Sequence, residues 1–369
     1  MVEIPSSVWD ITADWLRASV RPEDAAAFSN LISVNPERIA EGVAMSTAVY
    51  RLHLTYALGA RPGPATLVVK LPSTAAEVRE TARGWATYTR EALFYRDIAP
   101  TVALRIPRAY IAANDPRTDG YVVVMDDLAP AVSGNQIAGL PVDYARLALD
   151  EIAGLHISWW NRPELKALEA TPIQPFGDGR WVGIGDRHAA AWSLFEPFLA
   201  GRASPELYRV GERMAGVLEQ MMVDMARTPR TLCHGDFRAD NMMFAPNDAE
   251  GDGGAALITV DWQMPMQARG AFDVGYMMAM SVTTDLRRTH ETILLRRYHD
   301  KLMAAGVENY PWDEFFHDYR RALLIGFTYA VQAGASADLT HPVAEALLDS
   351  AVRRVDAAVQ DHGLEAFVD

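Results

Sequence analysis

Cysteine, long apolar runs and an N-terminal targeting pattern are scarce or missing in this chain of 369 residues. The one cysteine, Cys233, excludes an intrachain disulfide. No apolar run approaches the length that spans a bilayer, and the clean apolar run YVVVM has the size of a strand. The first ten residues, MVEIPSSVWD, lack the basic flank and apolar stretch of a signal peptide. We therefore expect a cytoplasmic protein without a membrane partner.

Positive charge is also in short supply. The net charge of −14 argues against nucleic acid as a partner, because phosphate binding needs a basic face. Only three of the 34 basic residues are lysines, namely Lys70, Lys166 and Lys301. Lys70 stands in the apolar segment TLVVKLP, which indicates a place where the wide fork of arginine does not fit.

The segment up to residue 126 has the pattern of a small mixed β-sheet with one main helix. Residues 43–58 alternate between apolar and polar, which is typical of a half-buried strand. TLVVKLP and GYVVVMDDLAP predict two more strands, and an apolar stripe at helical spacing predicts a helix over about 75–98. A helical pattern also covers VWDITADWLRASV near the N-terminus.

Beyond this segment the pattern becomes helical. Apolar faces at helical spacing cover residues 142–160, 205–226 and about 313–360. Between 231 and 262, by contrast, NMMF and ALITV predict two short strands joined by the turn-forming run APNDAEGDGG. The length of the chain suggests two packed domains, which we place at residues 1–126 and 127–369.

The motif LCHGDFRADNMMF, at residues 232–244, packs charged residues between two apolar runs. Asp236 and Asn241 have the D-x-x-x-x-N spacing of kinase catalytic loops, in which the aspartate takes a hydroxyl proton and the asparagine binds Mg²⁺. If NMMF pairs antiparallel with ALITV, Asp261 comes close to Asn241, because paired strands lie only about 5 Å apart. An amide oxygen and a carboxylate are ligands that Mg²⁺ prefers. The pattern therefore predicts a shared magnesium ion.

HGDFRADNMMF, followed by VDWQMPMQARGAFDVGY, resembles the aminoglycoside phosphotransferase and choline kinase-like family. The likeness is nearest to the branch that includes hydroxyacyl-coenzyme A kinases and ecdysteroid kinase-like proteins, and it extends over most of the chain. TLVVKLP is similar to the strand that holds the nucleotide lysine, REALFYRDIAP to the helix of its glutamate partner, and YVVVMDDLAP to the hinge. The resemblance implies an α+β, bilobal protein-kinase-like fold, with a small mixed β-sheet N-lobe and a larger, mainly helical C-lobe.

The same resemblance implies roles for the residues of the motif and implies ATP and Mg²⁺ as cofactors. Asp236 would be the catalytic base, and Asn241 and Asp261 would be the metal ligands. His234 would brace the catalytic loop, and Asp273 would support that loop from the large lobe.

On the nucleotide side, Lys70 would bind the α- and β-phosphates, and Glu91 would hold Lys70 in place. Glu77 and Glu80, on the same predicted helix, remain open as other partners of Lys70. The resemblance also implies that a hinge backbone binds the adenine. Its residues are Met125, Asp126, Asp127 and Leu128.

Glycine-rich phosphate loops are missing. No Gly-Lys pair occurs, which excludes a Walker A loop. EGVAMSTAVY, the phosphate-covering segment implied by the resemblance, has a single glycine, Gly42, and is no G-x-G-x-x-G loop. Ser46 and Thr47 would supply hydrogen-bond donors in its place.

The predicted activity is transfer of the γ-phosphoryl group of ATP to a hydroxyl of a small molecule. The acidic balance favours an aminoglycoside acceptor, as in an antibiotic-modifying kinase. Four aromatic residues instead favour a bulky alcohol such as a hydroxyacyl-coenzyme A, and both acceptors stay open. A non-catalytic nucleotide-binding pseudokinase is the alternative from another class. The sequence indicates no oligomeric state. The aromatic residues are Trp159, Trp160, Trp181 and Trp192.

Two other interpretations of the motif are weaker. Cys233 next to His234 suggests a thiol nucleophile, but neighbours on a strand point to opposite faces, so we expect Cys233 to face the core. His234, Asp236 and Asp240 resemble the ligands of a zinc or di-metal hydrolase, but that interpretation leaves the asparagine and the lysine without roles. We expect His156 to be a packing residue with its polar atoms satisfied.

Overall fold

The chain is described from a computed structural model, which covers residues 2–39, 46–59, 63–246 and 255–369. It forms two compact units. The first comprises Met1–Val102, Ile106–Pro130 and Val260–Met264, and the second comprises Ala103–Arg105, Ala131–Thr259 and Pro265–Asp369. A short segment far along the chain thus belongs to the N-terminal unit.

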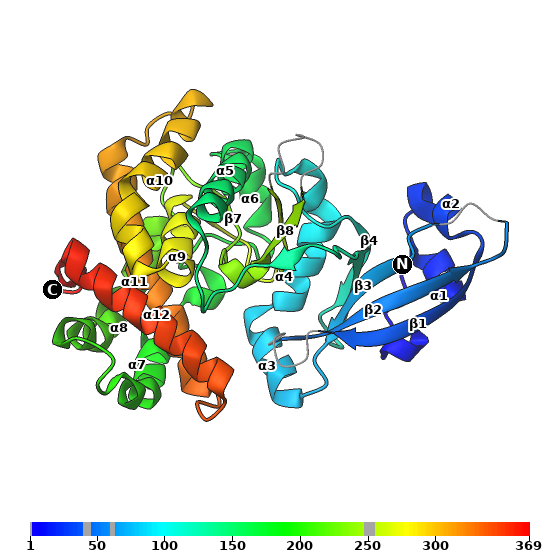
Figure 1. The fold of residues 1–369 in the computed structure, drawn as a ribbon, viewed down its shortest axis with the longest axis horizontal. Helices are drawn as coiled ribbons and strands as arrows, with labels where there is room; N and C mark the ends of the chain where they lie inside the picture. Colours follow the sequence, from blue (N-terminus) through cyan, green and yellow to red (C-terminus); the bar gives the residue numbers. More distant parts are fainter. Residues whose placement is uncertain (1, 40–45, 60–62, 247–254) are drawn as a thin grey trace. The chain divides into compact units, whose positions relative to one another are not determined.

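The first unit is built on a five-stranded sheet with the strand order β1-β2-β3-β5-β4 (Figure 1). Every pair of neighbouring strands is antiparallel, where a mixed sheet was expected. Along β3 the even positions are less buried than Leu67, Val69 and Leu71, so Lys70 lies on the opposite face from the apolar core. The strands are β1 (Leu31–Ile39), β2 (Thr47–Tyr56), β3 (Thr66–Pro72), β4 (Ala109–Asp115) and β5 (Gly120–Asp126).

The helix predicted over 75–98 is interrupted at Ala86, whose φ of 53° is left-handed. Before the break, Ala82 is the one buried residue of its helix, whereas nearly all of the next helix is buried. A straight helix keeps one face toward the core, so this change in burial requires a change of direction. The α-helices of this unit are α1 (Ala13–Ser19), α2 (Ala25–Phe28), α3 (Ala76–Trp85) and α4 (Thr87–Leu93), and a π-helical turn (Phe94–Ile98) continues α4.

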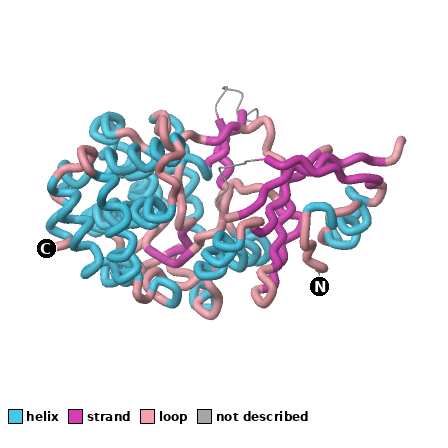
Figure 2. Tube along the Cα trace, turned by 90° about the horizontal axis from the view of Figure 1, so that it is seen from below, coloured by secondary structure: helices cyan, strands magenta, loops and turns pink. Residues whose placement is uncertain are grey.

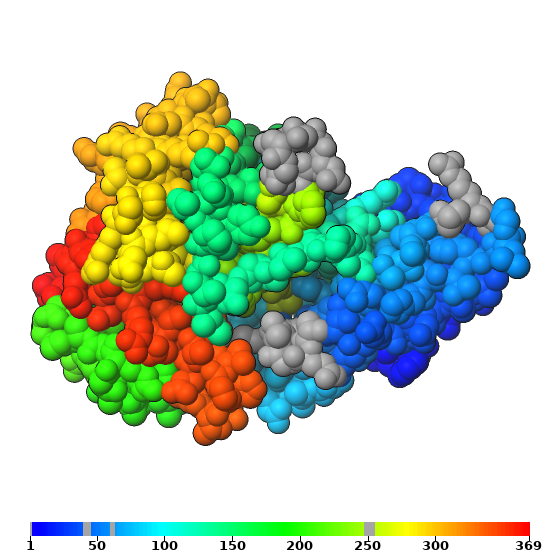
Figure 3. All heavy atoms as spheres, in the orientation of Figure 1, coloured from blue at the N-terminus to red at the C-terminus, as the bar shows by residue number. Residues whose placement is uncertain are grey.

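The second unit is mainly helical (Figure 2). Its α-helices are α5 (Val142–Trp159), α6 (Glu164–Leu168), α7 (Ile184–Phe195), α8 (Pro205–Met225), α9 (Ala271–Ser281), α10 (Thr284–Ala304), α11 (Trp312–Ser336) and α12 (Pro342–His362). On the face shown in Figure 3, the atoms of α12 lie between those of α10 and those of α7 and α8. None of the helices among the described residues is both long and apolar enough to cross a membrane.

Two small sheets of the second unit carry the segments around the motif. One pairs β7 with β10, and the other has the order β6-β8-β9. The predicted hairpin is present, because β8 and β9 pair antiparallel with Met242 opposite Thr259. The joining segment 247–254 lies outside the described residues. The strands are β6 (Val132–Ser133), β7 (Thr231–Cys233), β8 (Met242–Pro246), β9 (Ala255–Thr259) and β10 (Met266–Ala268).

Helix α9 is the centre of this unit, and every one of its residues is buried. It packs against α11 at Gly275, where a Cβ atom would lie 2.5 Å from the Cβ of Ala322 and 2.9 Å from the carbonyl oxygen of Tyr319. Only glycine permits so close an approach of the two helices.

We therefore expect Gly275→Ala to lower the free energy of unfolding by about 1–3 kcal/mol, the usual cost of overpacking a core. Gly216, an exposed glycine within α8, is the matched control, since a Cβ atom there meets nothing within 4 Å. Gly216→Ala should raise stability by roughly 0.5–1 kcal/mol, because alanine favours the helix. Urea denaturation measures both changes, and equal effects would contradict the close contact of α9 with α11.

Candidate active site

The 234–241 loop follows β7 and leads into β8. Gly235 has a φ of 83°, which allows the chain to turn sharply before Asp236. A single turn of 3-10 helix, Ala239–Asn241, then brings Asn241 back toward Asp236. The loop therefore places the two ends of the D-x-x-x-x-N motif in contact.

The Asp236 carboxylate has donors on both of its oxygens. Asn241 Nδ2 donates to Oδ2 over 2.9 Å and to the Asp236 carbonyl oxygen over 2.8 Å. The hydroxyl of Tyr276, from α9, donates to Oδ1 over 2.7 Å. Arg238 Nε lies 3.3 Å from the carboxylate, and its guanidinium also contacts Asp240. Asp240 thus braces the loop through Arg238.

A fully buried carboxylate, Asp273, fixes the start of the loop. It accepts from the backbone N–H of His234 over 2.7 Å and from that of Gly235 over 3.0 Å. The ring of His156 binds it through Nε2 at 3.1 Å. The side chain of His234 is also fully buried, and its Nδ1 accepts from the backbone N–H of Asp236. These bonds hold the backbone of the loop in one conformation.

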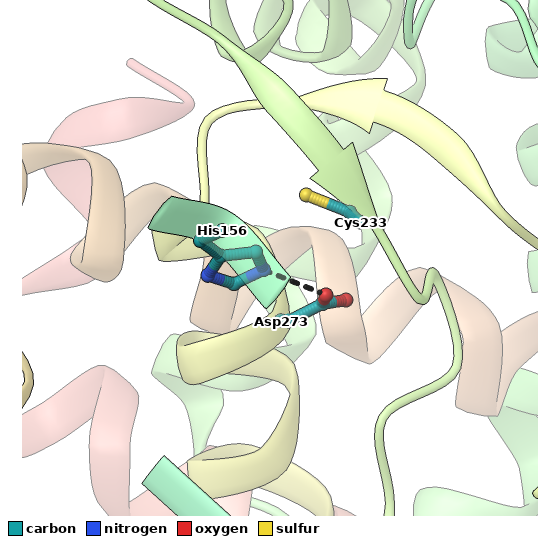
Figure 4. A group of neighbouring side chains, drawn as sticks. All are labelled: His156, Cys233 and Asp273. Atoms are coloured by element: carbon teal, nitrogen blue, oxygen red, sulfur yellow. Dashed lines mark hydrogen bonds and ion pairs between the residues drawn. The ribbon is translucent and has the colours of Figure 1, made fainter. Parts of the chain in front are cut away.

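Cys233 lies beside His156 and Asp273, and the three side chains have the composition of a metal site (Figure 4). Their atoms are already engaged, however. His156 Nδ1 bonds the hydroxyl of Tyr298 at 2.7 Å, and its Nε2 bonds Asp273. Burial and the negative charge of Asp273 raise the pKa of the Cys233 thiol well above its ordinary value, which opposes the thiolate that a metal requires. The cluster is therefore a support of the loop, and Cys233 faces the core as predicted.

In the first unit, Lys70 joins two carboxylates. Its Nζ lies 2.7 Å from Glu91 Oε1 and 2.8 Å from Asp261 Oδ1. Burial lowers the pKa of Lys70, but the charges of Asp261 and Glu91 outweigh it, so the net shift is upward. The second oxygen of Glu91 accepts from the hydroxyl of Tyr121 over 2.5 Å. The structure thus brings Lys70 together with Glu91, which is fully buried.

Glu77 and Glu80, the other candidate partners of Lys70, are exposed on α3. The segment after Asp261 is anchored in the same unit, because Trp262 is fully buried and stacks on Phe94 with ring centroids 3.7 Å apart. Asp261 itself has a left-handed φ of 66° and a side chain that is 31% exposed.

The predicted phosphate-contacting residues Ser46 and Thr47 stand at the start of β2. Ser46 Oγ donates to the side chain of Gln263, and the Ser46 carbonyl accepts from the hydroxyl of Tyr88. Thr47 is buried and opposite Pro72 in the sheet. Gly42 lies outside the described residues.

The predicted hinge residues lie at the C-terminal end of β5 and directly after it, in the first unit. Met125 and Asp126 still belong to the sheet, and the backbone N–H of Asp126 donates to the carbonyl of Arg108. Asp127 binds the guanidinium of Arg51, with Nε 2.6 Å away. Of the four predicted hinge residues, Asp127 and Leu128 therefore lie beyond the strand pairing.

Sequence reasoning missed Tyr276 and Tyr121, the two hydroxyls that bind the site carboxylates. Both tyrosines stand in apolar segments, FDVGYMMAM and GYVVVM, where the sequence pattern predicts only an ordinary core residue. A buried tyrosine hydroxyl needs a hydrogen-bond partner, so a tyrosine in such a segment was a sign that a polar group lies nearby.

Comparison with known proteins supports the resemblance seen in the sequence. The sequence profile of the ecdysteroid kinase-like family matches residues 189–307, which is less than half of the chain. No curated protein sequence matches.

Two solved structures resemble most of the chain. One is named as an aminoglycoside phosphotransferase from Ralstonia eutropha JMP134, with 16% identity, 94% of this chain and 96% of that chain covered, and a TM-score of 0.53. The other is a GDP and kanamycin complex of APH(2″)-IIIa, with 14% identity, coverage of 90% and 95%, and a TM-score of 0.50. At such identities the likeness concerns the fold, and it confirms the predicted α+β, protein-kinase-like class.

We expect Cys233 to resist a thiol-specific reagent such as DTNB in the native protein at mildly alkaline pH, because its side chain is buried and the pKa of its thiol is raised. In guanidinium chloride the same reagent should titrate one thiol per chain. Absorbance of the released thiolate measures both. Rapid modification of the native protein would show that the support beneath the 234–241 loop is open to solvent.

Proposed function

We propose that the protein is an ATP-dependent phosphotransferase, which moves the γ-phosphoryl group to a hydroxyl of a small molecule. The observation that carries the proposal is the geometry of the 234–241 loop, in which Asn241 orients the Asp236 carboxylate at the spacing of kinase catalytic loops. The kinase-like fold and the ecdysteroid kinase-like profile support it.

In the proposed reaction the acceptor oxygen attacks the γ-phosphorus, and the hydroxyl proton passes to Asp236. The bond from the γ-phosphorus to the β,γ-bridging oxygen breaks, and ADP leaves with its electron pair. Lys70, held by Glu91, fixes the nucleotide phosphates, and the backbone of Asp127 and Leu128 receives the adenine. Because the protein contributes little covalent chemistry, positioning and electrostatics supply most of the acceleration.

Mg²⁺, when bound, would neutralise phosphate charge, and the residues present fit that ion. The amide nitrogen of Asn241 is committed to Asp236, which leaves Oδ1 as the atom to face a cation. Asp261 supplies a partly exposed carboxylate. Asn241 directly precedes Met242, whose partner in the β8–β9 ladder is Thr259, two residues before Asp261. Hard oxygen ligands of this kind suit Mg²⁺.

The identity of the phosphate acceptor is less well defined than the nucleotide and metal sites. Trp159, Trp181 and Trp192 are buried in the helical unit, and Trp160 is half-buried beside Tyr310. The four tryptophans therefore give little support to a bulky apolar acceptor. Relatives suggest two classes to test: a sterol-like alcohol, from the name of the ecdysteroid kinase-like family, and an aminoglycoside, from the kanamycin complex. A hydroxyacyl-coenzyme A is the third class, carried by the resemblance in sequence. The nucleotide also needs testing, because the APH(2″)-IIIa structure contains GDP.

A panel of these three acceptor classes, with ATP or GTP and Mg²⁺ and with release of the nucleoside diphosphate as readout, tests the proposal. Turnover with one acceptor supports it. Nucleotide binding without turnover on any of them would instead favour the pseudokinase.

Asp236→Asn should lower turnover about a hundredfold to ten-thousandfold, the usual contribution of a general base. Nucleotide affinity, measured by calorimetry, and thermal stability should change little, because asparagine keeps the shape of the side chain. Asp240→Asn alters a second carboxylate of the loop, which contacts Arg238, and should lose far less turnover. Near-normal turnover in Asp236→Asn would sink the assignment of the base.

Lys70→Arg should lower kcat/KM by about a hundredfold, the cost of a misplacement of roughly 1 Å in a positioned site. The wider fork cannot occupy the place of an ammonium that sits between Glu91 and Asp261. Lys166→Arg is the matched control, because Lys166 is largely exposed and pairs with Glu169 at the surface.

Glu91→Gln should cause a smaller loss than Lys70→Arg. Combined, the two changes should cost less than the sum of their separate effects, as for groups that act as a unit. Full additivity in the kinetics of the double variant would argue that Glu91 does not act through Lys70.

A further inference from the structure

Tyr276 is the one contact of the Asp236 carboxylate that comes from outside the 234–241 loop among the contacts described above. Its hydroxyl donates to Oδ1 over 2.7 Å, while Asn241 donates to Oδ2 over 2.9 Å. A carboxylate has about four lone-pair directions, so these two donors and the longer contact from Arg238 Nε, at 3.3 Å, leave room for an incoming hydroxyl. Two donors on different oxygens fix both the position and the plane of the group.

The ring of Tyr276 is itself held firmly. It is 4% exposed, lies edge-on to Tyr329 with centroids 5.1 Å apart, and stacks with Phe272 at 5.9 Å. A Cβ atom at Gly326 of α11 would lie 3.4 Å from Cδ2 of the ring. Because α9 and α11 pack closely here, the hydroxyl has little freedom to leave Asp236.

The hydroxyl is also confined to one chemical role. Burial, followed by the negative charge of Asp236, raises the pKa of Tyr276 well above its ordinary value. The phenol therefore stays neutral, and its proton can serve only as a hydrogen-bond donor to the carboxylate. Tyr276 therefore orients Asp236 without adding to the positive charge that Arg238 already brings to within 3.3 Å.

We propose that Tyr276 is a positioning residue for phosphoryl transfer, which orients the Asp236 carboxylate toward the acceptor hydroxyl from the buried helix α9. The role rests on the proposed function, since it acts through the proposed base. It also links the packing of α9 against α11 to the rate of the reaction, because that packing sets where the hydroxyl stands.

Tyr276→Phe removes the hydroxyl and keeps the ring. We expect kcat to fall about tenfold to a hundredfold, as for a reacting group that is misplaced by up to roughly 1 Å. The KM for the nucleotide should stay within about twofold, because Tyr276 acts on the base alone and kcat and KM report different steps. Tyr310→Phe is the matched control, since Tyr310 is also buried and donates to a carboxylate, Asp318, over 3.0 Å. It should leave kcat unchanged.

The decisive comparison is made in the Asp236→Asn background, where Tyr276→Phe should cause no further loss of kcat. A merely structural hydroxyl would lower the rate by the same factor in both backgrounds. Any effect on stability is common to the single and double variants, so the comparison survives it. An equal factor in both backgrounds, or normal kcat in Tyr276→Phe, would overturn the proposal.

A crystal structure of Tyr276→Phe separates this inference from the proposed function. It should show the Asp236 carboxylate rotated or in more than one orientation, with the backbone of the loop unchanged. If no acceptor is ever phosphorylated, the proposed function fails, and the crystal structure still decides the orienting role. An Asp236 carboxylate that keeps its orientation without the hydroxyl would refute that role.

Discussion

The buried carboxylate of Asp273 is the contact on which the 234–241 loop depends. Burying a carboxylate costs several kcal/mol unless hydrogen bonds replace its water. Asp273 has three such donors, two from the loop backbone and one from His156, and it stands in the first turn of α9, where the helix dipole favours negative charge. Because the same bonds satisfy the carboxylate and the loop, neither can move without leaving a buried polar group unpaired.

The first unit also contains a buried carboxylate, Glu91, and here the main partner is a cation, Lys70. Glu91 is fully buried and Lys70 nearly so, and each would be costly alone. Three contacts offset this cost for the two charged side chains: their ion pair, the hydrogen bond from Tyr121 to Glu91 and the contact of Lys70 with Asp261. Arginine occupies nearly every other basic position of the chain, so a lysine here agrees with a place that takes a compact ammonium between two carboxylates rather than a planar fork.

Much of this arrangement could be predicted from short-range patterns. The alternation in TLVVKLP places Lys70 on one face of a strand, and the runs around APNDAEGDGG predict the β8–β9 hairpin, because both depend on neighbours in sequence. The break at Ala86 could not be predicted, since α3 and α4 together show one continuous helical pattern and the interruption follows from burial against the rest of the unit. The predicted division into residues 1–126 and 127–369 also assigns Val260–Met264 to the second domain, whereas this segment belongs to the first unit. The ion pair of Asp261 with Lys70 joins residues far apart in the chain, and a single boundary in the sequence cannot represent such a contact.

The hydrogen bond from Tyr276 to Asp236 also joins residues that are far apart in the chain. It illustrates how the carboxylates of this acidic chain obtain hydrogen-bond donors. With 48 acidic and 34 basic residues, ion pairs alone cannot serve every carboxylate. Tyrosine hydroxyls add a donor to three carboxylates that also contact a cation, from Tyr121 to Glu91, from Tyr276 to Asp236 and, away from the motif, from Tyr310 to Asp318. A neutral donor costs less to bury than a cation and stabilises the carboxylate less. At Asp236 the cation is Arg238, whose Nε lies 3.3 Å from the carboxylate, and the shorter bond from Tyr276 adds no charge to it. The contribution of the tyrosine is therefore geometric, because it fixes the direction in which the carboxylate faces.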